Sequence, residues 1–257
     1  MSVFCHLLGT GAAISDPHRT TTMLAFSDDA HPDQSLLVDC GGDALQRWQA
    51  VGGEIRDMAA LILTHVHPDH ISGLPLLMEK TWLSDREGDL PICGYQETID
   101  QANRCMDAFA SVTAGWDGMP EMVPHVVARK AGAPVWTRNP WRVTSAPVDH
   151  GPPTFGLRVE HMPSGTVMAY SCDTAPCDAV VELAHEADLL VHESNGAGPG
   201  HSSMVEAADV ARAAKAKQLV LVHLPPGDKQ ESLAVARDTF PETTLGVEGK
   251  SYPVARS

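Results

Sequence analysis

The segment Thr64-His65-Val66-His67-Pro68-Asp69-His70 decides how the rest of the chain is interpreted. It follows the apolar run Ala60–Leu63, which has the length and composition of a buried strand. Three histidines and one aspartate stand close together on a loop that Pro68 restricts, and two pairs of such ligands suit two metal ions a few ångströms apart. Imidazole with carboxylate is the ligand mixture expected for zinc, although iron or manganese can also be held.

Three further candidate ligands stand where other apolar strands are expected to end. They are His150, Asp173 and His223, which follow the strands expected at 142–148, 166–170 and 219–222. Side chains that emerge from neighbouring strand ends can converge on one edge of stacked sheets. Each of these residues alone is more often structural, but their joint occurrence in this order predicts a shared metal site.

The rest of the chain alternates short apolar runs with helical patterns. We expect further strands at 3–8, 22–26, 35–39, 155–161, 189–192 and 244–248, and helices at 43–51, 71–82, 97–112, 178–187, 204–216 and 231–240. No repeat, low-complexity tract or linker divides the chain. This pattern predicts two packed sheets with helices outside, in a single domain over residues 1–257 with a variable insertion-like segment at about 84–140 near the active site.

Composition restricts the partners and the compartment. The 257 residues include 18 Lys and Arg against 33 Asp and Glu, a formal net charge of −15. Such a charge disfavours a large nucleic-acid partner, because phosphate binding depends on Lys and Arg. No apolar run approaches the about 18 residues of a membrane span, and no signal peptide is recognisable, so no membrane partner is expected. Six dispersed cysteines without a CxxC motif indicate a reducing cytoplasm.

The motifs resemble those of the metallo-β-lactamase superfamily, whose HxHxDH hallmark corresponds to His65, His67, Asp69 and His70. Further segments resemble the ribonuclease Z branch of that superfamily. They are Leu8–Ala13 with Arg19-Thr20-Thr21, His150 with Pro153–Gly156, Ser171–Thr174, His192–Ser194 with His201–Ser203, and Leu219–His223. The resemblance implies an α/β fold, namely a four-layer αβ/βα sandwich of two mixed sheets flanked by helices.

The same resemblance implies a ligand set for two divalent metal ions. It assigns one ion to His65, His67 and His150, the other to Asp69, His70 and His223, and a bridging role to Asp173. A hydroxide shared by two cations is a strong nucleophile at neutral pH, and the paired charges hold a substrate oxyanion.

Proton transfer is the other chemistry that the resemblance implies. In the ribonuclease Z branch the histidine that matches His201 protonates the leaving oxygen, with help from the glutamate that matches Glu193. Asp69 counts among the catalytic residues as well as the ligands. We interpret His192 and Cys172 as structural residues, and leave the role of His18, which lies in a loop beside Arg19, open.

Two departures from the branch affect the expected substrate. Only 23 positions separate His150 from Asp173, too few for the long arm with which ribonuclease Z enzymes hold precursor tRNA. His223 is followed by Leu224–Asp228 instead of the Ser and Arg that the family uses for phosphate binding. One interpretation of the long segment is a pocket wall for a small ligand, formed by Trp116, Trp136, Arg129 and Lys130. The alternative for the two tryptophans is ordinary packing.

The sequence therefore predicts a binuclear metal-dependent hydrolase that cleaves small or cyclic phosphodiesters with a metal-bridging hydroxide. Zinc is the expected metal. The alternatives are a lactonase or thioester hydrolase of the same fold, a tRNA 3′-processing endoribonuclease, and a non-catalytic scaffold. A small or short phosphodiester is the expected partner, and a homodimer is implied by analogy with the branch.

Overall fold

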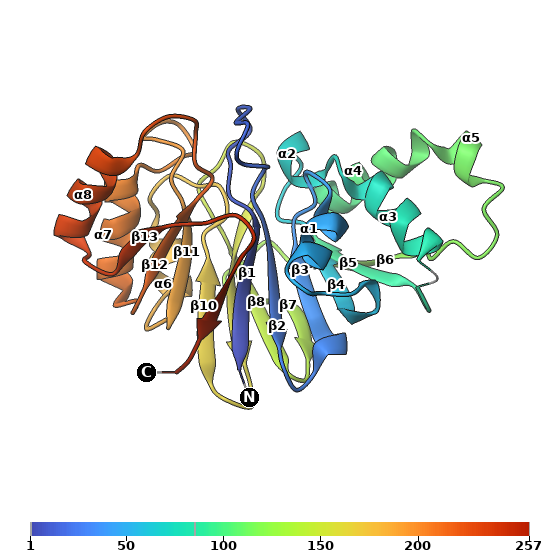
Figure 1. Cartoon of the computed structure of the whole chain (residues 1–257), viewed down its shortest axis with the longest axis horizontal. Coiled ribbons are helices and arrows are strands. Elements are labelled where there is room, and N and C mark those ends of the chain that lie inside the picture. The colour runs from blue at the N-terminus through green and yellow to red at the C-terminus, as the bar shows by residue number, and fades with distance from the viewer. Residues whose placement is uncertain (1, 85, 257) are drawn as a thin grey trace.

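The computed structural model describes residues 2–84 and 86–256, which form two packed β-sheets (Figure 1). The first sheet has the strand order β14 (Lys250–Val254), β1 (Val3–Gly9), β2 (Met23–Asp28), β3 (Ser35–Val38), β4 (Met58–Ile62), β5 (Leu90–Gly94) and β6 (Met122–Val126). The second has the order β13 (Thr243–Leu245), β12 (Leu219–Val222), β11 (Leu189–Glu193), β10 (Thr166–Tyr170), β9 (Phe155–His161), β8 (Trp141–Pro147) and β7 (Ala133–Arg138). Both sheets combine parallel and antiparallel pairs, so both are mixed.

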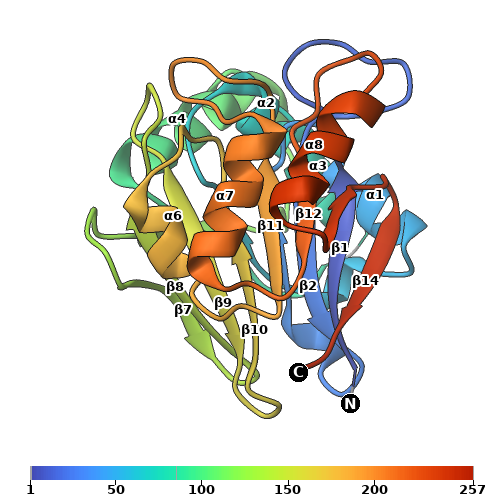
Figure 2. The same ribbon diagram turned by 90° about the vertical axis from the view of Figure 1, so that its left-hand side faces the viewer.

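Helices cover the outer face of each sheet. The first sheet is covered by α1 (Ala44–Ala50), α3 (Leu74–Leu83) and α4 (Gln96–Asp107), and the second by α6 (Asp178–Leu183), α7 (Met204–Ala214) and α8 (Gln230–Thr239), which lie in front of their strands in Figure 2. The short elements are α2 (Pro68–Ile71), α5 (Ala110–Thr113), η1 (Pro32–Gln34) and η2 (Ile55–Asp57). The predicted four-layer sandwich is confirmed. Within residues 2–84 and 86–256, no helix has the length and apolar character that crossing a bilayer requires.

Burial of the central strands on both faces explains their apolar sequences. In β3, Leu36 and Val38 belong to the core between the two sheets, whereas Leu37 belongs to the core under α1 and α3. All three side chains are fully buried. Successive residues of a strand point to opposite faces, so a strand with both faces covered reads as a continuous apolar run.

Two predicted helices are interrupted in the structure. The helix predicted at 71–82 begins as α2, breaks at Ser72-Gly73 and continues as α3. A Cβ on Gly73 would lie 2.0 Å from the carbonyl oxygen of Gly42, so glycine is what allows the loop after β3 to approach this break. The helix predicted at 97–112 likewise divides into α4 and α5 around Ala108 and Phe109.

Four strands were not predicted, and each of them contains a proline. They are β5, β6, β7 and β14, with Pro91, Pro124, Pro134 and Pro253. Proline cannot donate to a strand ladder and is tolerated best at sheet edges. Three of these strands, β6, β7 and β14, are edge strands, where a missing N–H donor costs least.

His6 on β1 gives the fold a dependence on pH that can be measured. Its ring nitrogens lie 2.7 Å from the hydroxyls of Ser27 and Ser251, and burial lowers its pKa from 6.5 to about 4. The unfolded chain therefore binds more protons between pH 6.5 and pH 4, so stability falls as the pH falls through this window. At 1.36 kcal/mol per pKa unit, the loss attributable to His6 is about 3 kcal/mol.

We expect the His6→Gln variant to lose less stability than the wild type between pH 6.5 and pH 4. Urea unfolding at several pH values, with a chelator present throughout, measures this difference. His185→Gln is the matched control, because His185 is exposed. Parallel stability curves for the wild type and His6→Gln would contradict the assignment.

Candidate metal centre

Five strands end at the same edge of the sandwich. Each of them ends on, or is closely followed by, a polar residue that was a candidate from the sequence. The strands are β4, β8, β10, β11 and β12, and the residues are His65, His150, Asp173, Glu193 and His223. This edge is at the top of Figure 1, where α2 lies, whereas the two chain ends lie at the bottom. Residues that are up to 158 positions apart in the sequence are thereby brought together.

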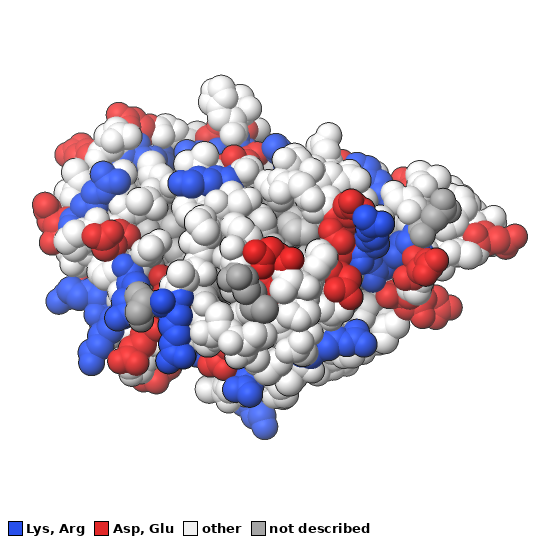
Figure 3. All heavy atoms as spheres, turned by 60° about the horizontal axis from the view of Figure 1, so that its bottom comes forward, with Lys and Arg blue, Asp and Glu red and all other residues white. Residues whose placement is uncertain are grey.

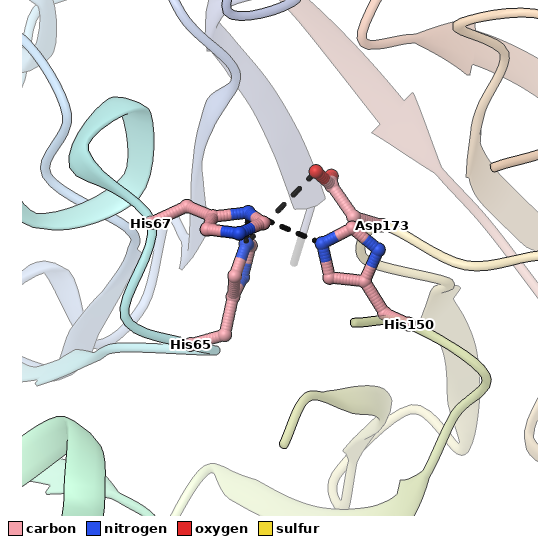
Figure 4. Close-up of side chains that lie close together, drawn as sticks. All are labelled: His65, His67, His150 and Asp173. Carbon is pink, nitrogen blue, oxygen red and sulfur yellow. Dashed lines mark hydrogen bonds and ion pairs between the residues drawn. The ribbon is translucent and has the colours of Figure 1, made fainter. Parts of the chain in front are cut away.

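A first group of candidate ligands gathers around His67. Its Nδ1 lies 3.1 Å from His65 Nε2 and 3.2 Å from His150 Nε2 (Figure 4). The carboxylate of Asp173 completes the group, with Oδ2 at 4.0 Å from His65 Nε2. These four side chains come from both sheets and point toward one another.

A second group shares Asp173 with the first. Asp173 Oδ2 lies 3.4 Å from His70 Nε2 and 3.4 Å from His223 Nε2. Asp69 Oδ2 lies 3.5 Å and 3.4 Å from the same two nitrogens. One carboxylate oxygen therefore stands between two ligand groups, as expected of a residue that bridges two cations.

The donor set fits divalent cations. Four ligands placed tetrahedrally about 2.0–2.1 Å from zinc lie about 3.4 Å from one another, close to most of the separations measured in both groups. His70 Nε2 and Asp173 Oδ1 are buried without a hydrogen-bond partner. Buried polar atoms are rarely left unpaired, and a bound cation would supply the partner that such atoms lack.

The protonation states of His65, His67 and Asp173 also suit metal binding. Burial lowers the pKa of His65 and of His67, which favours the neutral imidazole that binds a cation. Burial alone would raise the pKa of Asp173, but the charges of His223 and His70 outweigh it and hold that pKa well below its usual range. Asp173 is therefore a carboxylate at neutral pH.

Asp39 orients the second group and was missed by sequence analysis. His70 Nδ1 donates to Asp39 Oδ2 at 2.8 Å, so its Nε2 is the nitrogen free to bind a cation. Asp39 also accepts from the backbone N–H and the hydroxyl of Thr64 at 2.8 and 2.9 Å. The signal available in the sequence was the same as for the ligands, an aspartate at the end of a buried strand.

We expect Asp39→Asn to weaken metal binding by about 10–100-fold, because the amide cannot replace a carboxylate as the partner of His70. Competition with a chromophoric chelator measures the affinity. The control is Asp33→Asn on the exposed side of η1. Unchanged affinity in the folded Asp39→Asn protein would contradict the role.

Glu193 and His201 form a pair beside the ligand groups. His201 Nδ1 donates to Glu193 Oε1 at 2.9 Å, and this hydrogen bond raises the pKa of His201 against the opposing effect of burial. The buried Glu193 carboxylate is fixed by the backbone N–H groups of Thr174, Asn195 and Ser202. His201 stacks on His223, with ring centroids 5.5 Å apart, and therefore faces the second ligand group.

Backbone strain is concentrated at the same edge. Asp39, Cys172 and His223 have φ angles of 63°, 55° and 53°, in the left-handed region that residues other than glycine rarely adopt. His223 is itself a candidate ligand, Cys172 directly precedes Asp173, and Asp39 accepts a hydrogen bond from His70. Such strain persists where the surrounding structure determines the conformation, and it clusters at functional sites.

Other residues considered from the sequence lie outside both ligand groups. His18 is exposed, and its backbone N–H donates to Asp16 at 2.8 Å. Cys172 is buried with its Sγ 3.6 Å from His65 Nδ1, on the side of that ring away from His67. His192 is buried, with Nδ1 2.7 Å from the carbonyl of Glu193.

Trp116, Trp136 and Arg129 of the long segment contact neighbouring side chains, whereas Lys130 is exposed. Trp116 stacks on Trp82, with ring centroids 4.7 Å apart, and Trp136 is buried on β7. Arg129 lies over the Tyr95 ring at 5.4 Å and forms an ion pair with Glu97. Trp136 also lines a cavity of about 400 Å³, so both interpretations of the tryptophans stay predictions.

Known proteins are similar to this chain in sequence and in fold. The family model described as "Beta-lactamase superfamily domain" matches residues 34–224. The chain is 33% identical to a ribonuclease Z of Mycobacterium bovis (strain BCG / Pasteur 1173P2) over 91% of each chain. The metallo-β-lactamase fold protein YhfI from Bacillus subtilis superposes with a TM-score of 0.80 and 24% identity, covering 98% of this chain and 100% of that one. The short form of human tRNase Z superposes with a TM-score of 0.79 and 22% identity, covering 98% and 99%.

The fold and the His/Asp edge define a metal-dependent hydrolase of the phosphodiesterase type. The chain belongs to the metallo-β-lactamase superfamily, in its ribonuclease Z-like branch. The long arm of that branch is absent between His150 and Asp173, where the chain forms only a short loop, β9, a tight turn and β10.

Proposed function

We propose that the chain binds two divalent metal ions and hydrolyses small or cyclic phosphodiesters. The observation that carries this proposal is the position of Asp173 Oδ2, 4.0 Å from His65 Nε2 and 3.4 Å from His70 Nε2. We assign the ions to two sets that share Asp173, namely His65, His67 and His150, and Asp69, His70 and His223. Nitrogen and carboxylate ligands in tetrahedral spacing favour zinc over manganese or iron.

When bound, divalent ions activate a water molecule and neutralise charge that develops on the phosphate. The chain supplies the proton for the leaving group. Glu193 holds Nδ1 of His201, so the other nitrogen, Nε2, is the one that donates to the leaving oxygen. The carboxylate of Asp69 is partly exposed beside His223, and we assign it a catalytic role in addition to its role as a ligand.

Three features support a small substrate. The arm is absent, and Leu224–Asp228 follows His223 where the family has its phosphate-binding Ser and Arg. The net charge is −15. Figure 3 shows the molecule with the bottom of Figure 1 turned forward, which is the side away from the edge that holds the candidate ligands, and acidic and basic side chains lie beside one another there. Each feature disfavours a long polyanion.

Cleavage of precursor tRNA is the second candidate. The observation in its favour is the 33% identity to a protein named ribonuclease Z over most of both chains. The two candidates differ in the size and charge of the substrate, so direct comparison of substrates separates them.

The test uses the full chain loaded with zinc or manganese. We expect turnover of bis(p-nitrophenyl) phosphate and of cyclic nucleotides, and a lower kcat/KM for precursor tRNA. A panel of lactones and thioesters is assayed in parallel, because an activated water attacks carbonyl carbon as well. Turnover confined to lactones or thioesters, or no turnover of any substrate by the metal-loaded protein, would overturn the proposal.

The remaining parts of the proposal concern location and assembly. We propose a cytoplasmic protein, since all six cysteines are free thiols. We also propose a homodimer, by analogy with the branch. Sedimentation velocity at micromolar concentration tests the assembly, and a single monomeric species would contradict it.

A further inference from the structure

A cavity of about 390 Å³ lies next to the candidate metal centre. Its wall is built from segments that continue directly from three candidate functional residues. Ser194–Gly196 follow Glu193, Ser203–Val205 follow His201 after one residue, and Pro225 follows His223 after one residue. The opposite wall comes from the first part of α8 and the residues before it. The cavity therefore adjoins the side of the centre that holds the Glu193–His201 pair.

Hydrogen bonds fix the shared wall. The backbone N–H of Asn195 donates to Glu193 Oε2 at 2.8 Å, and that of Gly196 donates to the carbonyl of Ser202 at 3.0 Å. The Ser194 hydroxyl donates to the carbonyl of Val222 at 3.2 Å. The backbone that lines the cavity also holds Glu193, the partner of His201. A group bound in the cavity would therefore have a defined position relative to His201.

The charges around the cavity disfavour an anionic occupant. Two carboxylates, Asp228 and Glu231, face one ammonium, Lys229. The Lys229 ammonium is engaged, since its Nζ donates to the carbonyls of Pro226 and Gly227 at 2.9 and 3.1 Å. A phosphate in the cavity would therefore meet net negative charge, whereas an uncharged group would not.

The uncharged lining suits a flat heterocycle. Met204, Val205 and Val235 supply apolar surface, and the Asn195 amide and the Ser232 hydroxyl supply both donors and acceptors. Binding sites for small molecules combine predominantly apolar walls with a few placed polar groups in this way. The volume is sufficient for a nucleobase together with part of its sugar.

We propose that this cavity binds the neutral nucleoside of the leaving group when a phosphodiester is cleaved at the metal centre. The inference rests on the proposed function and extends it to a substrate class. Water adds to phosphorus, the bond from phosphorus to the nucleoside oxygen breaks, and that oxygen takes a proton from His201 Nε2. The proton released by the attacking water passes to solvent, and His201 is reprotonated from solvent. The products are a phosphomonoester and a nucleoside hydroxyl, which belong to one molecule when the substrate is a cyclic nucleotide.

The test fills the cavity from α8 with Val235→Trp, at a position that is 47% exposed. The control is Val112→Trp on α5, which is 58% exposed and lies outside the cavity. Isothermal titration with adenosine and with uridine reports binding without catalysis. We expect both nucleosides to bind the wild type and Val112→Trp, and the affinity to fall at least about tenfold in Val235→Trp.

Kinetics on the metal-loaded proteins separate this inference from the proposed function. We expect Val235→Trp to lower kcat/KM for 3′,5′-cyclic AMP at least about tenfold, and to change kcat/KM for bis(p-nitrophenyl) phosphate less than about threefold, because its leaving group is smaller. Asn195→Ala is the second variant, and a fall in nucleoside affinity is expected there too. Equal nucleoside affinity in all variants, with normal turnover of bis(p-nitrophenyl) phosphate, would overturn the nucleoside cavity alone. Absence of phosphodiester turnover in the wild type would overturn the proposed function, while the titrations would still decide whether nucleosides bind.

Discussion

Replacing Asp173 by alanine is expected to lower kcat/KM for phosphodiesters by about 10³-fold or more. Asp173 Oδ2 belongs to both ligand groups, so its removal weakens both metal sites together. A 10³-fold decrease corresponds to a loss of about 4 kcal/mol of transition-state stabilisation, at about 1.36 kcal/mol for each tenfold change. Metal content measured by plasma mass spectrometry should fall at the same time, because the five histidines and Asp69 of the two groups lose their common partner.

The control for this experiment is Asp117→Ala, in an exposed loop far along the chain from the ligands. Its activity and metal content should match those of the wild type. Asp173→Asn is tested beside Asp173→Ala, because the amide keeps the shape of the side chain and separates loss of charge from loss of packing. Full metal content and full activity in either Asp173 variant would remove this residue from the centre.

The His201→Ala variant is expected to show an effect that depends on the leaving group. General acid catalysis contributes about 10²–10⁴-fold, and it matters most when the leaving oxygen is strongly basic. We therefore expect kcat to fall at least about 100-fold for cyclic nucleotides, whose leaving group is an alcohol. For bis(p-nitrophenyl) phosphate, whose leaving group is a stable phenolate, the fall should be less than about tenfold.

His185→Ala serves as the matched control, since it removes an exposed histidine of the same chain. Glu193→Gln should give a smaller effect in the same direction, because Glu193 acts through Nδ1 of His201. A fall of the same size for both substrates would show that His201 does not donate the proton. The KM values for both substrates should change little, as His201 is assigned to the chemical step.

The sequence predicted the fold and the candidate ligands, but it did not indicate Asp39, which supports one of them. The candidate ligands were recognisable because His65, His150, Asp173 and His223 each closely follow an apolar strand, and the ends of neighbouring strands meet at one edge. Asp39 has the same placement but contacts His70 instead of pointing at the shared point, and only coordinates reveal that difference.

Interactions between distant segments explain what the sequence did not indicate. The cavity beside α8 arises from three segments that are remote in sequence, so no local pattern marks it. The strands β6 and β7 contain prolines and have exposed faces, so their composition resembles that of loops. They form because a paired neighbour is available on one side, which is a tertiary effect.

The pairing of β14 with β1 has a consequence for how the protein is made. Residues 250–254 run antiparallel to residues 3–7, so β1 is synthesised well before the strand that pairs with one of its edges. Until β14 has been made, this edge of β1 is unpaired, and unpaired edges promote association between chains. His223 likewise follows every other candidate ligand in the sequence, so the proposed second metal site is complete only after this residue has been made.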